Sequence, residues 1–172
     1  MSKKTDSNQS SAEGILPSYF ALVRQWEAGN PLGQLFTGAR QSNSLFNGVM
    51  TLFRHLSQVD FVIDRLADRK VRPRVRWILR WAVTNYLFLK SPPFPVTANA
   101  CVAFARRRFH RREAAFINAV CRRLTAKTPE VYEKWLQQTA PSHVRWSMPE
   151  ELFGRWESRF GRAKLERMAG TF

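Results

Sequence analysis

Arginine and lysine are the residues whose number and spacing carry the clearest chemical meaning in this sequence. Twelve of them fall between Arg69 and Arg112, and no Asp or Glu interrupts the run. A guanidinium group presents a planar fork of N–H donors that binds phosphate bidentately. Twelve like charges without acidic neighbours in sequence therefore favour a phosphate-binding surface over a face that is merely solvated.

The candidate phosphate-binding residues fall into three groups along the chain. Trp77 and Trp81 interleave with the first group, and an exposed ring there would stack on an unpaired RNA base. Core packing is the alternative for both rings, and the sequence leaves the two interpretations open; for Phe109 it favours the core. The candidate RNA-binding residues are Lys70, Arg72, Arg74, Arg76 and Arg80, then Arg106, Arg107, Arg108, Arg111 and Arg112, then Arg122 and Arg123.

No group of residues has the spacing typical of catalysis or metal binding. His55, His110 and His143 are isolated from one another, which argues against a zinc site. Cys101 and Cys121 lie among apolar residues of expected helices, so we predict buried, reduced thiols rather than a Cys–His nucleophile. The eight glycines form no phosphate-binding or S-adenosylmethionine loop. We predict a non-enzyme with no catalytic residue, no metal and no cofactor.

The bulk composition indicates a folded protein that attracts polyanions. The chain has 172 residues, 44% of them apolar, and a formal net charge of +15. This length suits one domain with an appendage, and the charge predicts RNA, DNA or an anionic surface as partner. Two cysteines are no disulfide framework, which fits a reducing cytoplasm. The most apolar segment, residues 77–89, is too short and too arginine-flanked to cross a membrane, so no membrane partner is expected.

Apolar spacing predicts an all-α fold. Periods of three and four residues indicate about seven helices packed on one core within residues 14–128, and no segment has the period of a strand. Asp60 is expected to cap a short helix, and Pro73 to start a long one that ends before Ser91-Pro92. Residues 1–13 are polar and are expected to form a disordered tail, with the first helix beginning near Pro17. Residues 129–172 are expected to form a helical extension, with a loop over 141–148, Ser147 as a helix cap and exposed apolar positions.

An ordered set of residues along the chain carries a family resemblance. The set comprises Arg80-Trp81-Ala82-Val83, Leu87-Phe88-Leu89, Pro93, Val96, Asn99, Ala103 to Ala105, Phe116-Ile117-Asn118-Ala119-Val120 and Arg122-Arg123. It resembles the NusB family, and more closely the NusB-like N-terminal module of Fmu/Sun-type ribosomal RNA methyltransferases, which form 5-methylcytosine. Ser147-Met148-Pro149 and the two expected helices separated by Gly161 resemble the continuation of that module.

The resemblance implies a NusB-like, RNA-binding helical bundle that is not catalytic alone. The methyltransferase domain, with its catalytic cysteines and cofactor loop, has no counterpart in the sequence. Thr84, Ala100 and Thr51 depart from residues usual in the family, and only Lys3 and Lys4 stand where NusB factors often carry an arginine-rich RNA-binding segment. Asn99 and Asn118 match positions that the family tends to keep as asparagine; we expect both amides to satisfy backbone groups between helices, with RNA contact as the less favoured alternative.

Three functional hypotheses follow. The favoured one is an RNA-binding module, directed at ribosomal or similar structured RNA and serving a methyltransferase subunit in trans or acting alone. The second is a protein-interaction module in transcription antitermination or ribosome assembly, with a ribosomal or transcription protein as partner. The third is the N-terminal fragment of a split or truncated methyltransferase. DNA binding ranks lower because no helix-turn-helix signature is present.

Overall fold

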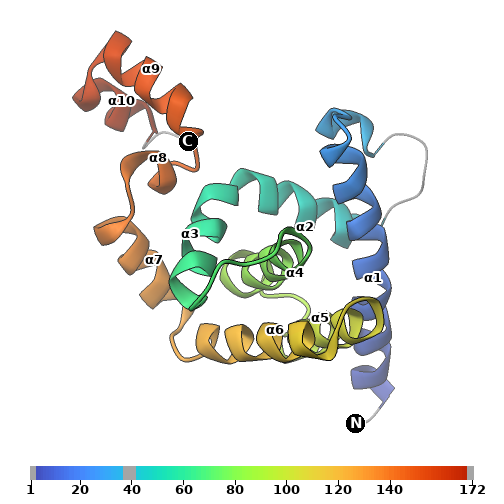
Figure 1. Cartoon of the computed structure of the whole chain (residues 1–172). Helices are drawn as coiled ribbons and strands as arrows, with labels where there is room; N and C mark the ends of the chain where they lie inside the picture. Colours follow the sequence, from blue (N-terminus) through green and yellow to red (C-terminus); the bar gives the residue numbers. More distant parts are fainter. Residues whose placement is uncertain (1–2, 37–41, 170–172) are drawn as a thin grey trace.

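The protein is all-α, as the sequence predicted (Figure 1). The computed structural model describes residues 3–36 and 42–169, and the side chains of residues 14–36 and 42–168. No strand occurs in these ranges. The helices are α1 (Lys3–Glu27), η1 (Leu32–Gln34), α2 (Asn43–Arg54), α3 (Leu56–Leu66), α4 (Pro73–Thr84), the π-helical turn η2 (Asn85–Leu89), α5 (Phe94–Arg108), α6 (Arg111–Leu124), α7 (Pro129–Thr139), α8 (Ser142–Arg145), α9 (Glu150–Phe160) and α10 (Arg162–Ala169).

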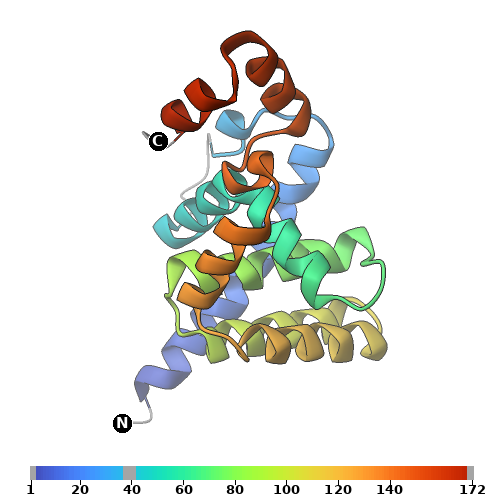
Figure 2. The same ribbon diagram turned by 90° about the vertical axis from the view of Figure 1, so that its left-hand side faces the viewer.

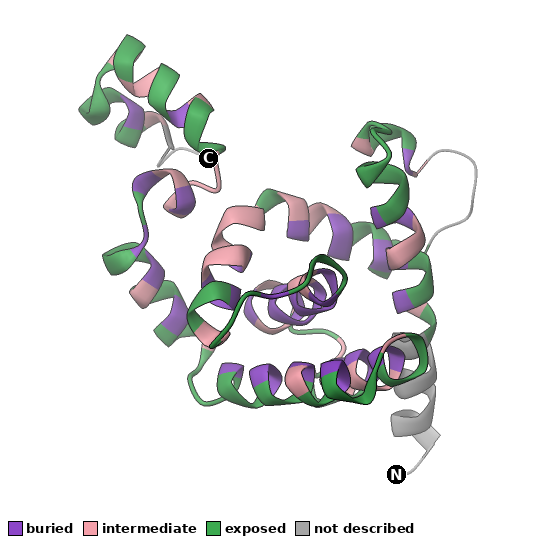
Figure 3. Ribbon diagram, in the orientation of Figure 1, coloured by how far each residue is buried: buried purple, intermediate pink, exposed green. Residues whose placement is uncertain are grey.

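Helix α4 forms the centre of the bundle and contacts α2, α3, α5 and α6. Figure 3 shows it buried along most of its length. Proline at its first position has no N–H to leave unpaired, which is why the helix starts there. Trp81 approaches α2 so closely that a Cβ on Gly48 would overlap its ring. Glycine at residue 48 therefore lets α2 and α4 pack at this distance.

Two expectations about helix ends were wrong. Helix α1 begins at Lys3 and carries Pro17 in its interior, whereas a disordered tail was expected over residues 1–13. The polar start lacks an apolar period, so the sequence contained no signal for this helix. Helix α3 begins at Leu56, directly after α2, and Asp60 lies inside it instead of capping it. The side chains of Lys3 and Lys4 lie outside the described part of the chain.

The C-terminal extension divides into a docked half and an outlying half. Tyr132, Leu136 and Val144, from α7 and α8, belong to the main core, and Trp135 stacks on Phe61 of α3. Figure 2 shows α7 running along the body toward α9 and α10, which lie at the end away from α6. Phe153 and Leu165 are buried, yet neither joins the main cluster. Helices α9 and α10 therefore pack mainly on each other and on α8.

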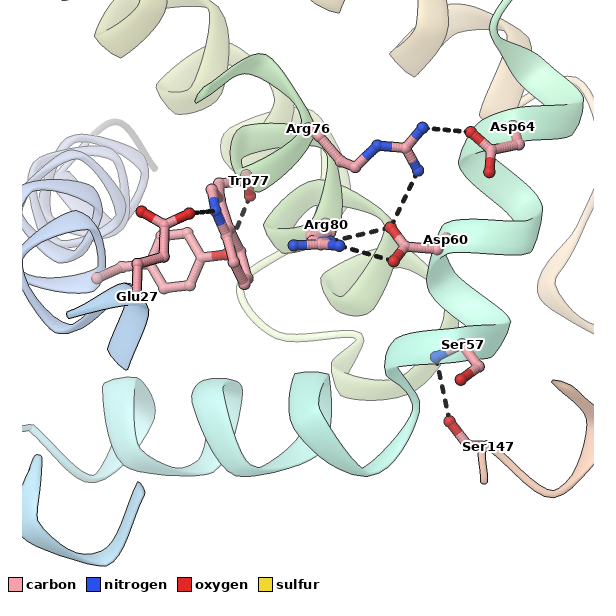
Figure 4. Close-up of polar contacts among 9 residues, drawn as sticks. Glu27, Ser57, Asp60, Asp64, Arg76, Trp77, Arg80 and Ser147 are labelled. Carbon is pink, nitrogen blue, oxygen red and sulfur yellow. Dashed lines mark hydrogen bonds and ion pairs between the residues drawn. The ribbon is translucent and has the colours of Figure 1, made fainter. Parts of the chain in front are cut away.

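The segment 141–148 was expected to be a loop and instead contains α8. Its position is fixed by polar contacts to α3. Gln58 donates its amide N–H to the Arg145 carbonyl at 2.6 Å. The Ser57 backbone N–H donates to the Ser147 hydroxyl at 3.3 Å (Figure 4). Ser147 thus serves a contact between helices and does not cap α9, whose N-cap position is Pro149.

Candidate nucleic-acid interface

Arg76 and Arg80 are tied to carboxylates from outside the acid-free run. Arg80 Nη2 lies 2.7 Å from Asp60 Oδ2, and Arg76 Nη1 lies 3.2 Å from Asp60 Oδ1 (Figure 4). Arg76 also pairs with Asp64. Burial opposes the charge on Arg76, but the hydrogen bonds and charges of Asp64 and Asp60 outweigh it and raise its pKa. These two arginines join α4 to α3, so they contribute little to a free phosphate-binding face.

Arg72 and Arg74 share a carboxylate on α6. Arg74 Nη2 lies 3.0 Å from both oxygens of Glu113, and Arg72 Nη1 lies 3.4 Å from one of them. Glu113 also accepts the His110 backbone N–H. Burial acts to raise the pKa of Glu113, but the Arg74 hydrogen bond, the His110 backbone and the nearby arginine charges bring it below its usual value. The Arg72 side chain remains 70% exposed, so it can still meet a ligand.

Arg123 is also engaged. It donates to the Leu66 carbonyl at 2.8 Å and to Asp68 at 3.1 Å, which ties α6 to the end of α3. Five of the twelve candidates pair with a carboxylate of the described part of the chain: Arg72, Arg74, Arg76, Arg80 and Arg123.

Trp77 and Trp81 belong to the core, which corrects the interpretation that they present rings for base stacking. They are 4% and 6% exposed. Trp77 donates its indole N–H to Glu27 at 2.8 Å, and the Arg80 guanidinium covers its ring at 4.0 Å. Trp81 packs on Tyr19 with 4.8 Å between ring centroids. Because α4 lies at the centre of the bundle, residues on several of its sides are buried, including Trp77 and Trp81 beside the apolar stripe.

Several basic side chains converge on a groove between residues 69–72 and the start of α6. Its volume is about 790 Å³, and Val71, Val75 and Phe116 supply apolar wall. The N-terminal end of α6 adds the partial positive charge of its unpaired N–H groups. Glu113 is the one carboxylate among the lining residues. The basic lining residues are Arg69, Lys70, Arg72, Arg111 and Arg112, joined by His110; we call this the basic groove.

Arg69 is a member of the basic groove that the sequence-based set of candidates missed. Its guanidinium lies 4.5 Å from the centroid of the half-buried Phe116 ring. The sequence feature that could have identified Arg69 is its place at the start of the acid-free run of residues 69–112. Lys70, Arg72, Arg111 and Arg112 were predicted, and the structure brings them together here. Arg106, Arg107, Arg108 and Arg122 are exposed on α5 and α6 but do not line this groove.

Asn99 and Asn118 do not play the structural role expected of them. Both are exposed, and neither side-chain amide forms a hydrogen bond with a described residue. The buried amide is that of Asn85, which donates to the carbonyls of Ser91 and Pro92 at 3.1 and 3.3 Å and so holds the turn between η2 and α5.

The cysteines and histidines show no reactive arrangement. Cys101 and Cys121 are both buried as predicted, and burial raises the pKa of the Cys121 thiol to about 12. Burial also lowers the pKa of His55, which stacks on Phe88 at 4.1 Å. In the described ranges, no three or more His, Cys, Asp or Glu residues are grouped to hold a metal ion. None of the described helices combines the length and apolar character needed to span a bilayer.

The fold and the groove define an all-α protein with a concave, cationic surface of a kind suited to phosphates. The model of the NusB family matches residues 28–126, more than half of the sequence, and the chain belongs to the NusB family. It is 35% identical over 111 residues to "Transcription antitermination protein NusB" of Picosynechococcus sp. (strain ATCC 27264 / PCC 7002 / PR-6). That match covers 64% of this chain and 47% of the relative, so the chain spans about half of the relative's length. No solved structure matches the chain.

Proposed function

We propose that this NusB-family chain is a non-catalytic RNA-binding protein that holds the phosphates of structured RNA in the basic groove. One observation carries the proposal. Arg69, Lys70, Arg111 and Arg112 line one concavity, and none of them forms an ion pair with a described residue. Unpaired cations that share a groove attract a polyanion more strongly than the same charges spread over a convex surface.

Ribosomal RNA is the RNA that we propose. The support is the ordered resemblance to the NusB-like module of Fmu/Sun-type methyltransferases, together with the helix, Gly161 and helix that follow Pro149 as in that module. A role beside an rRNA methyltransferase, in trans or within a longer protein, follows from the same resemblance. A role in transcription antitermination is supported by the name of the cyanobacterial relative.

A protein partner is the second candidate. A cavity of about 480 Å³ opens between α1, α4 and α5, with Phe20, Phe104 and Phe109 in its lining. Aromatic side chains rimmed by arginines are common at protein interfaces. This surface supports a complex with a ribosomal or transcription protein that leaves the basic groove free.

The test is RNA binding by the purified chain and by the double variant Arg111→Gln/Arg112→Gln, with ribosomal RNA fragments and random RNA at two salt concentrations. We expect the wild-type affinity to fall steeply with salt, because phosphate contacts release counterions. The variant should bind all RNAs more weakly by a similar factor, since phosphate contacts carry no base identity.

The matched control is Arg65→Gln/Lys134→Gln, which removes two exposed charges that do not line the groove. It should bind RNA like the wild type apart from a small change due to net charge. Salt-insensitive binding, or equal effects of the two double variants, would refute the proposed groove. Absence of RNA binding even at low salt would favour the protein partner.

A further inference from the structure

Helix α9 carries a second surface that combines cations with aromatic rings. Leu152, Trp156 and Phe160 recur every four residues and form a stripe, and Arg155 and Arg159 flank it one residue before the rings. These five residues line a hollow of about 410 Å³. No carboxylate lines it. We call these residues the α9 face.

The rings of the α9 face are partly accessible, in contrast to Trp77 and Trp81. Trp156 and Phe160 are both half-buried and meet edge to face, with 6.3 Å between centroids. Arg159 and Lys164 lie 5.5 and 5.4 Å from the centroid of Phe160. Phe153, which lies next to the stripe on the same side of the helix (three residues before Trp156 and seven before Phe160), is the α9 residue that is buried. The stripe therefore borders the packed side of α9, and its two rings keep a part of their surface open to a ligand.

Glu157 of α9 and Glu166 of α10 pair with a different arginine. Arg162 Nε lies 3.9 Å from Glu157 and 3.4 Å from Glu166, and its Nη2 donates to the Ser142 hydroxyl. Arg155 and Arg159 form no ion pair with a described residue. The free charges beside the two rings are thus positive, whereas the exposed Glu150 and Glu151 lie in the first turn of α9 and do not line the hollow. A protein partner would have to supply acids for these arginines, whereas RNA supplies phosphates and stackable bases together.

We infer that the α9 face is a second RNA contact, one that binds a single strand by stacking an unpaired base on Trp156 and Phe160 while Arg155 and Arg159 hold the adjacent phosphates. The inference rests on the proposed RNA-binding function. The basic groove lies at the start of α6, and α9 lies at the opposite end of the molecule (Figures 1 and 2). The α9 face therefore binds a part of the RNA different from that held in the groove.

The experiment titrates the full chain with fluorescently labelled oligouridine and with a fully paired RNA duplex, following anisotropy. Trp156→Leu keeps an apolar side chain but removes the ring. It should weaken oligouridine binding about 5- to 100-fold, as expected for loss of one base–aromatic stack, and should leave duplex binding nearly unchanged. Trp156→Phe, which keeps an aromatic ring, should bind oligouridine more tightly than Trp156→Leu and nearly as tightly as the wild type. If the position only filled space in the fold, the two variants would bind alike.

A charge variant tests the phosphate contacts of the same surface. Arg155→Gln/Arg159→Gln should lower the slope of log K against log salt for oligouridine by about 1.4, because each phosphate contact to a single strand contributes about 0.7. Arg65→Gln/Lys134→Gln is the control for charge. Phe46→Leu, which removes an exposed ring on α2, is the control for loss of an aromatic side chain.

The outcomes separate the inference from the proposed function. If Arg111→Gln/Arg112→Gln weakens RNA binding while the α9 variants bind like the wild type, the inference fails and the basic groove stands; the α9 face is then free for a protein. If the wild-type chain binds no RNA, both fail. If 4-thiouridine in oligouridine crosslinks to the peptide that contains Trp156, and Trp156→Leu weakens binding at unchanged melting temperature, the inference is supported.

Discussion

The role of each arginine in this protein depends on which residues other helices place beside its side chain. Arg80 looks like a phosphate ligand beside Trp77 in sequence, yet it reaches Asp60 on α3 and covers the Trp77 ring. Arg111 and Arg112 look the same in sequence and line an open groove without a carboxylate partner of their own. The difference is the distance of each side chain from the acidic residues of α3. The spacing of residues within one helix does not predict this distance.

Glu113 makes the stability of the fold depend on pH in the acid range. Its pKa is lowered in the folded protein, so it contributes stability that is fully present above the ordinary Glu value of 4.5 and is lost as the pH falls through the folded value. Glu113→Gln should be less stable than the wild type at pH 7, and the difference should shrink in acid. Urea unfolding at a series of pH values measures this.

The control for this prediction is Glu133→Gln, which removes an exposed carboxylate that forms no ion pair with a described residue. Its unfolding free energy should follow that of the wild type. Parallel curves for the wild type and Glu113→Gln across the acid range would contradict the assigned role of Glu113.

At the scale of elements, the pairing of α3 with α4 rests on a half-buried cluster. Asp60 accepts hydrogen bonds from both Arg76 and Arg80, whose side chains are 22% and 15% exposed. Removing the carboxylate leaves two guanidinium groups short of a partner, and hydrogen bonds to charged groups each stabilise by about 1.5–3 kcal/mol. This cluster explains why a run of cations without local acids is compatible with a compact bundle.

Asp60→Asn should therefore lower the free energy of unfolding by about 1.5–3 kcal/mol, the range for a hydrogen bond to a charged group. Asp68→Asn, which disrupts the exposed pair with Arg123, should cost less than about 1 kcal/mol. Chemical denaturation of the two variants gives the comparison. A larger loss of unfolding free energy for Asp68→Asn than for Asp60→Asn would show that the α3–α4 cluster stabilises the fold less than the exposed pair does.

At the scale of the whole molecule, the bundle and the C-terminal hairpin have separate cores. The main core runs from α1 to α8 and includes Tyr132, Leu136 and Val144, while Phe153 and Leu165 lie apart. The main apolar cluster therefore continues past residue 128, where the composition changes, and includes α7 and α8. The hairpin adds the α9 face and is tied to α8 by the contacts of Arg162 with Ser142 and of Glu166 with Arg145.

Truncation tests this division. A chain ending at residue 149 should keep a cooperative transition close to that of the full chain. A chain ending at residue 128 should melt much lower, because Phe61 loses Trp135, and Gln58 loses the Arg145 carbonyl. Calorimetry of the three lengths provides the measurement, and a large loss of stability in the longer truncation would show that the hairpin is part of the main core.

The sequence by itself determined the all-α class, the helix that starts at Pro73, the buried cysteines and the cationic character, since these depend on local spacing and composition. The tertiary structure decided which cations stay free. Asp60 lies 20 residues before Arg80, and Glu113 lies 39 residues after Arg74, so only folding brings these opposite charges together. It also buried Trp77 and Trp81, exposed Asn99 and Asn118, and assembled the basic groove from two segments about 40 residues apart, because burial depends on neighbours across the fold.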